Sequence, residues 1–138
     1  MGTYMYLYSG GEPLVRKADI IRLCETHPDC EFLAFTNGTL IDEDWARFFR
    51  DNRFLVGLSL DGTKDLHDAN RVDSQGRGTW NTVARALTLL QKWQVEVNLL
   101  CVVTGPAARR GQAIYQNLKK LGGCYLQFIP CLDPMEEE

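Results

Sequence analysis

Short apolar runs alternate along the 138-residue chain with stretches in which apolar residues recur three and four positions apart. Unbroken apolar runs are typical of strands in a parallel sheet, and the second spacing is typical of amphipathic helices. The sequence therefore predicts strands over 4–8, 32–35, 54–60, 95–103 and 125–129, and helices over 18–26, 43–51, 80–92 and 112–121. The order is β-α-β-α-β-loop-α-β-α-β, without a linker. We expect one α/β domain of about five parallel strands, buried on both faces, with helices outside.

Composition excludes some classes of protein. Apolar residues make up 45% of the chain, as in a globular protein, and the formal net charge of −3 gives no electrostatic reason to expect nucleic acid as a partner. No apolar run reaches the ~18 residues of a membrane span, and the N-terminus lacks the pattern of a secretory signal. The five cysteines include no C-x-x-C pair. We interpret them as small buried side chains of a cytoplasmic protein.

Polar and glycine residues gather where the predicted strands end. The segment 10–12 (Gly-Gly-Glu) follows the first strand, Thr36 ends the second, Ser59 lies at the end of the third, and Arg71 falls in the polar stretch 63–78 beyond it. That stretch is too long for a plain connection. Ligands of parallel α/β proteins bind outside the carboxyl ends of the strands. Exposed glycine backbone beside a carboxylate suits a small zwitterion with an ammonium group.

Most of these residues also have a plain structural interpretation. The dipeptides at 37–38 (Asn-Gly) and 61–62 (Asp-Gly) are common in turns, and an isolated arginine such as Arg71 is usually a solvated charge. We interpret His27 and His67 as surface or loop residues, because neither has an obvious partner acid or nucleophile. Neither G-x-x-x-x-G-K-[ST] nor G-x-G-x-x-G occurs, which disfavours nucleotide triphosphates and dinucleotides.

Taken together and in order, four stretches resemble the radical S-adenosylmethionine (SAM) enzymes, and within them the anaerobic sulfatase-maturating enzymes. They are 8–14, 36–41, 59–71 and 125–132. The likeness implies a partial (β/α) barrel that holds SAM against a 4Fe-4S cluster, so that residues 1–138 would be an incomplete radical SAM core domain. It implies an oxidoreductase that converts a Cys or Ser of a sulfatase to formylglycine. Its partners would be a peptide or protein substrate and a reductant.

The resemblance also implies a set of cofactor-binding residues: Gly10, Gly11, Glu12, Thr36, Ser59, Arg71 and Leu132. The glycine carbonyls and the Glu12 carboxylate would hold the amino group of the methionine moiety. Ser59 and Arg71 would take its carboxylate and the ribose side, since a guanidinium can donate two parallel hydrogen bonds. Thr36 would lie nearby at the rim, and Leu132 would line the adenine pocket.

Departures from the family pattern limit this expectation. The chain has no C-x-x-x-C-x-x-C cluster motif and no cysteine-rich C-terminal domain, so it resembles the central piece of such an enzyme. We expect no catalytic and no metal-binding residue in this chain, and no activity from it alone. Ser9 stands where a glutamine is expected, which leaves open a maturase of another peptide. A non-catalytic ligand-binding or interaction module and an unrelated α/β fold are further alternatives, and uncovered strand edges favour self-association.

Overall fold

The computed structural model describes residues 5–132, with residues 5–7 described as backbone only. Five parallel strands form one sheet, in which neighbours follow the chain order β1-β2-β3-β4-β5. The strands are β1 Met5–Tyr8, β2 Glu31–Thr36, β3 Phe54–Ser59, β4 Glu96–Val103 and β5 Tyr125–Pro130. The helices are the 3₁₀ helix η1 Pro13–Arg16, α1 Lys17–Thr26, α2 Glu43–Asp51, α3 Lys64–Asn70, α4 Trp80–Lys92, α5 Gly105–Ala108 and α6 Gly111–Lys120. The prediction of about five parallel strands with helices outside is confirmed.

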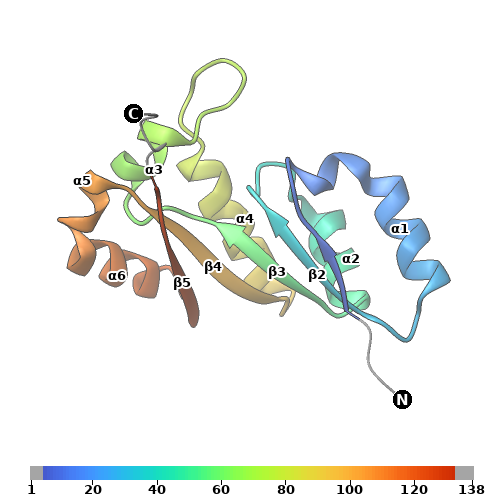
Figure 1. The fold of residues 1–138 in the computed structure, drawn as a ribbon. Helices are drawn as coiled ribbons and strands as arrows, with labels where there is room; N and C mark the ends of the chain where they lie inside the picture. Colours follow the sequence, from blue (N-terminus) through green and yellow to red (C-terminus); the bar gives the residue numbers. More distant parts are fainter. Residues whose placement is uncertain (1–4, 133–138) are drawn as a thin grey trace, which may run out of the picture.

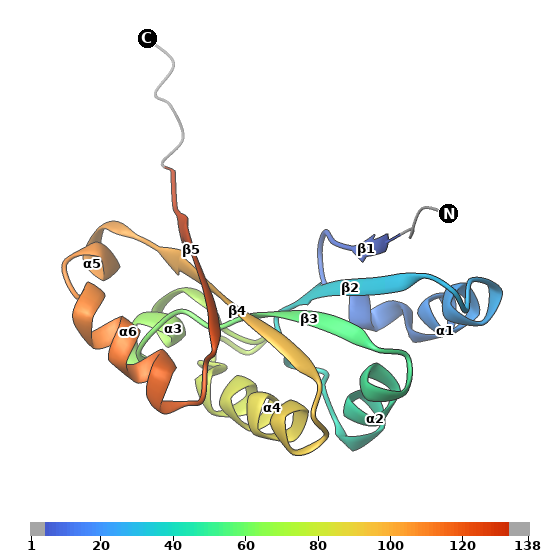
Figure 2. The same ribbon diagram turned by 90° about the horizontal axis from the view of Figure 1, so that it is seen from below.

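The helices lie on one face of the sheet. Figures 1 and 2 show α1, α2, α4 and α6 on the same side of the curved sheet, and no helix of residues 5–132 lies on the opposite side. Side chains of a strand point alternately to the two faces, and burial follows this alternation in β2, where Phe32 and Ala34 are buried and Leu33 and Phe35 are half-buried. The expectation that strands are buried on both faces is therefore wrong for β2, and β5 is mostly exposed.

Aromatic side chains fill the core between the sheet and α2. The rings of Phe32 and Phe54 lie 5.3 Å apart, and Phe49 lies 5.0 Å from Phe54. Trp45 stacks on Phe49 at 5.2 Å. The Asp42 carboxylate accepts a hydrogen bond from the Trp45 amide at 2.8 Å, so α2 begins at the N-cap that the sequence indicates.

The polar stretch 63–78 is more ordered than its composition suggests. It contains α3, and beyond α3 a β-bridge joins Val72 to Gly78 and closes a loop that projects from the molecule (Figure 1). His67 of α3 is 0% exposed, so the prediction of a surface or loop residue is wrong. A seven-residue helix presents too few apolar positions to reveal a helical period. Within residues 5–132, no helix is long and apolar enough to cross a membrane.

Candidate ligand site at the carboxyl ends of the strands

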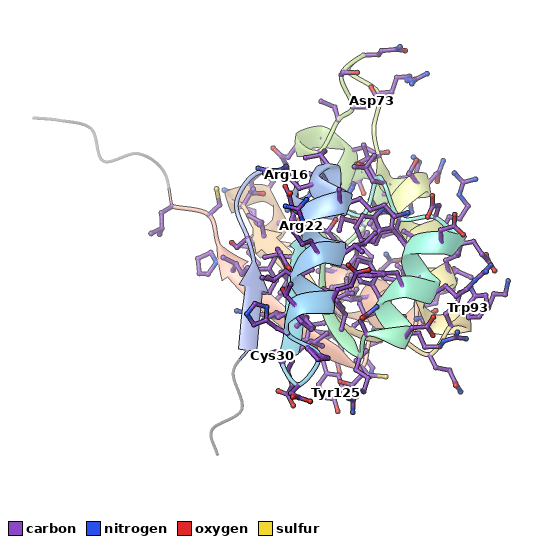
Figure 3. The ribbon with its side chains drawn as sticks, turned by 90° about the vertical axis from the view of Figure 1, so that its right-hand side faces the viewer. Arg16, Arg22, Cys30, Asp73, Trp93 and Tyr125 are labelled. Atoms are coloured by element: carbon purple, nitrogen blue, oxygen red, sulfur yellow. The ribbon has the colours of Figure 1, made fainter. Side chains whose placement is uncertain are left out.

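The candidate binding residues lie at one end of the sheet. In Figure 3, Cys30 and Tyr125 lie at one end of the molecule; Cys30 directly precedes β2, and Tyr125 is the first residue of β5. Asp73, in the loop after α3, lies at the other end, and Arg16, in the segment after β1, lies toward that same end. The carboxyl ends of the parallel strands therefore meet where the sequence places its polar and glycine residues.

Gly10 and Gly11 shape the exit from β1. Their φ angles are +87° and +57°, a backbone conformation that favours glycine. A Cβ atom at either position would meet no heavy atom within 4 Å. The two glycines are thus required by the path of the chain, and they leave its backbone exposed beside Glu12. Both line an open pocket together with Glu12 and Arg16.

The Glu12 carboxylate is held in place by the end of β2. Its Oε1 accepts hydrogen bonds from Thr36 Oγ1 at 2.6 Å and from the Leu14 amide at 3.3 Å, and its Oε2 accepts from the Asn37 amide at 2.8 Å. Thr36 Oγ1 in turn accepts from the Gly38 amide at 3.0 Å. Because each carboxylate oxygen can accept two hydrogen bonds, Oε2 keeps one acceptor position. That position suits an ammonium group.

A second cluster centres on the ion pair between Arg71 and Asp61. Arg71 Nε donates to Asp61 Oδ2 at 2.5 Å, and Asp61 Oδ1 accepts from the Val102 amide at 2.8 Å. The Asp61 side chain is 9% exposed and that of Arg71 is 27% exposed. Arg71 is therefore not the solvated charge of the plain interpretation, and Asp61-Gly62 is more than a turn.

Two buried polar residues, His67 and Thr79, connect the backbone of Asp61 to the backbone of Arg71. His67 Nδ1 accepts from the Asp61 amide at 3.1 Å, and His67 Nε2 lies 3.0 Å from Thr79 Oγ1. The Thr79 hydroxyl donates to the Arg71 carbonyl at 3.1 Å, so the network assigns the imidazole proton to Nε2. Burial lowers the pKa of His67, which keeps the imidazole neutral.

Ser59 lies between the two clusters. It follows Leu58, which pairs in register with Thr36, and it is half-buried. In the described part of the chain its hydroxyl has no hydrogen-bond partner. Leu132 is 86% exposed beyond β5.

The structure joins only some of the predicted site residues directly. It brings Glu12 to Thr36, whereas Ser59 and Arg71 do not line the pocket at Glu12. Sequence reasoning missed Asp61 and Thr79 as partners of the site. An acid directly after a strand was the available signal for Asp61.

The cysteines do not gather into a cluster site. Burial raises the pKa of Cys24 and of Cys101 to about 11, so both stay protonated thiols at neutral pH. Among residues 5–132, no group of three or more His, Cys, Asp or Glu side chains could hold a metal ion. A cluster bound by three thiolates therefore does not fit the arrangement of residues 5–132.

Comparisons with known proteins agree on one family. The family model described as the radical SAM superfamily matches residues 1–108. A cysteine-type anaerobic sulfatase-maturating enzyme of Clostridium perfringens is 43% identical over 145 aligned positions, covering 99% of this chain. A serine-type enzyme of Klebsiella aerogenes is 40% identical over 92% of this chain.

A solved structure shows the same fold. It is described as native anSMEcpe with bound AdoMet and Cp18Cys peptide, and it matches with a TM-score of 0.93 and 42% identity over 100% of this chain. The matched region is 40% of that structure's chain, 39% of the Clostridium enzyme and 33% of the Klebsiella enzyme. The chain therefore spans about two fifths or less of the length of these relatives.

Proposed function

Because the chain belongs to the radical SAM superfamily, we propose that it forms the SAM-binding core of an enzyme that oxidises a Cys or Ser side chain of a sulfatase to formylglycine. The observation that carries this proposal is the Glu12 carboxylate, fixed by Thr36 and the Asn37 amide with one acceptor position left beside exposed glycine backbone. Relatives of both the cysteine type and the serine type support the reaction class.

Each candidate residue has a role that its chemistry supports. The Gly10 and Gly11 carbonyls and the free acceptor position of Glu12 receive the ammonium group of SAM. The Ser59 hydroxyl and the exposed part of the Arg71 guanidinium take the carboxylate and the ribose side, as the resemblance implies. Thr36 orients the Glu12 carboxylate through its hydroxyl hydrogen bond.

Of the candidate residues, only Leu132 is assigned to the adenine, and none is assigned to the chemistry of the cofactor. Leu132 supplies an apolar surface that the adenine would cover. When bound and supplied with an electron, SAM provides the hydrogen-abstracting chemistry of the family.

We also propose that these 138 residues bind SAM without cleaving it. The thiolates that hold the family's cluster are not present in this sequence, so it has no site for the group that passes an electron to SAM. Anaerobic reconstitution with iron and sulfide tests this directly. We expect no 4Fe-4S absorbance approaching one cluster per chain, and a clean, reducible cluster at that ratio would overturn the proposal.

Calorimetry with S-adenosylhomocysteine, a stable relative of SAM, tests the binding site. We expect the chain to bind it, and Arg71→Ala to weaken binding by roughly 10- to 100-fold, as loss of a hydrogen bond to a charged group implies. Arg77→Ala is the matched control, because Arg77 is an exposed arginine of the same loop that pairs with Asp73. Equal weakening by both variants would contradict the assignment of Arg71.

A maturase of another peptide is the second candidate function, and Ser9 favours it. Ser9 is exposed and lines the pocket at Glu12, where a changed side chain can alter what binds. A chimera that carries residues 1–138 in place of the matching region of the Clostridium enzyme separates the two. Formylglycine formation on a cysteine peptide supports the sulfatase substrate. If formylglycine forms on that peptide only after Ser9→Gln, the result supports another peptide as the substrate of the unaltered chain.

Self-association is a further proposal for this chain. Within residues 5–132, no strand pairs with the outer edge of β5, and Tyr125 and Phe128 on this strand are 71% and 44% exposed. Uncovered strand edges with apolar side chains favour pairing between copies. Light scattering at tens of micromolar, a concentration suited to contacts of modest area, should give a dimer or larger species, and a uniform monomer would contradict this.

A further inference from the structure

We propose that Asp61, together with His67 and Thr79, positions the Arg71 guanidinium for the carboxylate of a bound ligand. This inference rests on the proposed function, since it takes Arg71 as the group that meets the methionine carboxylate. It adds positioning residues that do not themselves touch the ligand.

The ion pair leaves part of the guanidinium free. A guanidinium has five N–H donors, and Asp61 receives Nε at 2.5 Å and, more weakly, Nη2 at 3.4 Å. Among the described residues, the two N–H groups on Nη1 and the second one on Nη2 have no acceptor, and the side chain is 27% exposed. Asp61 therefore holds one edge of the arginine and leaves the opposite edge for an anion.

The Asp61 carboxylate is itself fixed. Its Oδ1 also accepts from the Val102 amide near the end of β4, at 2.8 Å. The carboxylate is thus tied to a strand of the sheet and cannot follow Arg71 if the arginine moves. The orientation of the guanidinium is set by the rigid sheet, even though Arg71 lies outside it.

A ring of hydrogen bonds connects the backbone groups of Asp61 and Arg71. The Asp61 amide donates to His67 Nδ1, His67 Nε2 donates to Thr79 Oγ1, and the Thr79 hydroxyl donates to the Arg71 carbonyl. The side-chain ion pair completes the ring from Arg71 back to Asp61. Its centre, His67, is 0% exposed and packs edge-on against Trp80 at 5.7 Å. Each link of this ring pairs one donor with one acceptor, so the links favour the same orientation of Arg71.

Such a ring reduces the cost of binding. Ordering a long arginine side chain costs conformational entropy. If Arg71 is already ordered in the free protein, a ligand carboxylate meets a prepared donor pair. A purely structural ring would instead stabilise the fold and leave ligand preference unchanged. The two roles are separated by comparing ligands with and without a carboxylate.

The test uses two probes, S-adenosylhomocysteine and 5′-methylthioadenosine, which lacks the amino acid portion. In Asp61→Asn the side-chain oxygen can still accept from the Val102 amide, but the amide nitrogen then faces Arg71 Nε, donor against donor. We expect affinity for S-adenosylhomocysteine to fall by about tenfold or more, and affinity for 5′-methylthioadenosine to change less than about twofold. Equal weakening of both probes would overturn the positioning role.

The chain offers a matched control and a gentler variant. Asp73→Asn breaks a similar pair, in which Asp73 accepts from Arg77 Nε at 2.8 Å and from the Arg77 amide at 2.9 Å, in the projecting loop. It should leave both affinities unchanged. Thr79→Val keeps the shape of the side chain but opens the ring at its hydroxyl. It should weaken S-adenosylhomocysteine selectively, by about threefold, and an equal loss for both probes would count against the ring.

A readout without ligand keeps this inference separate from the proposed function. The Nε–Hε NMR signal of Arg71 reports its bond to Asp61 in the free chain. It should be sharp and slow to exchange with water, and Asp61→Asn should make it exchange faster. If neither probe binds the unaltered chain, the proposed function fails, and the NMR signal still decides whether Asp61 orders Arg71. A fast-exchanging Arg71 signal in the unaltered chain would overturn the inference.

Discussion

Glu12→Gln is the substitution that most directly disturbs the site. The side chain keeps its size and one acceptor oxygen, which can still receive Thr36 Oγ1 and the Leu14 amide in place of Oε1. Its amide nitrogen then lies where Oε2 accepts from the Asn37 amide at 2.8 Å, so two donors face each other. The substitution therefore removes one charge-assisted hydrogen bond between the segment after β1 and the end of β2.

The size of the effect follows from that geometry. A hydrogen bond to a charged group contributes about 1.5–3 kcal/mol when it is buried. Glu12 is only half-buried, so water can replace part of the lost bond, and we expect a loss of about 1–2 kcal/mol in the free energy of unfolding. In a domain of this size that lowers the Tm by roughly 3–8 °C. Loss of the acceptor for an ammonium group should also weaken S-adenosylhomocysteine by about tenfold.

Thermal unfolding followed by circular dichroism, together with calorimetry, measures both effects. Glu25→Gln is the matched control, because Glu25 is an exposed acid of the neighbouring helix α1. It should change neither the Tm nor the affinity. If Glu12→Gln shifted the Tm no more than Glu25→Gln does, the carboxylate would not connect the ends of β1 and β2, and the reasoning would be refuted.

Three further predictions concern the surroundings of the site. Gly57→Ala places a Cβ in steric conflict with the Phe35 ring, so the free energy of unfolding should fall by about 1–3 kcal/mol in urea titrations. Adding Phe35→Leu should restore part of it, and a neutral Gly57→Ala would contradict the close packing. Burial lowers the pKa of His67 below its ordinary 6.5, so the unfolded chain binds a proton first. Stability should therefore fall as the pH drops below the ordinary value of 6.5. His67→Gln should abolish that slope, and a slope that survives would assign it to another group. The Arg110 guanidinium holds the pKa of Asp65 below its usual range, yet both side chains are exposed. Asp65→Asn should therefore shift the Tm by less than about 2 °C. A larger shift would show that this ion pair is stronger than expected.

The part of the site around Glu12 and Thr36 could be predicted from the sequence because it follows a general rule. Ligands of parallel sheets collect at the carboxyl ends of the strands, so Glu12 and Thr36, each next to a strand end, were expected at the same edge. Their hydrogen bond confirms this. The strand order also follows from the alternation of elements, because each helix returns the chain to begin the next parallel strand.

The part of the site around Arg71 and Asp61 depends on tertiary contacts that no local pattern reveals. Arg71 reaches Asp61 because it caps the C-terminus of α3, which returns the chain toward the end of β3. His67 is polar, and polarity alone predicts exposure, whereas its partners Asp61 and Thr79 become visible only in the folded chain. The exposure of one sheet face was missed for a related reason, since an apolar strand does not say which of its faces a helix will cover.

The central claim is that residues far apart in the chain contact one small ligand. A structure of the chain with S-adenosylhomocysteine bound measures this most directly. We expect the amino group to lie within hydrogen-bond distance of Glu12, and the carboxylate of the same molecule to contact Ser59 and Arg71. A ligand that occupies the pocket at Glu12 while Ser59 and Arg71 remain without contact to it would contradict the account.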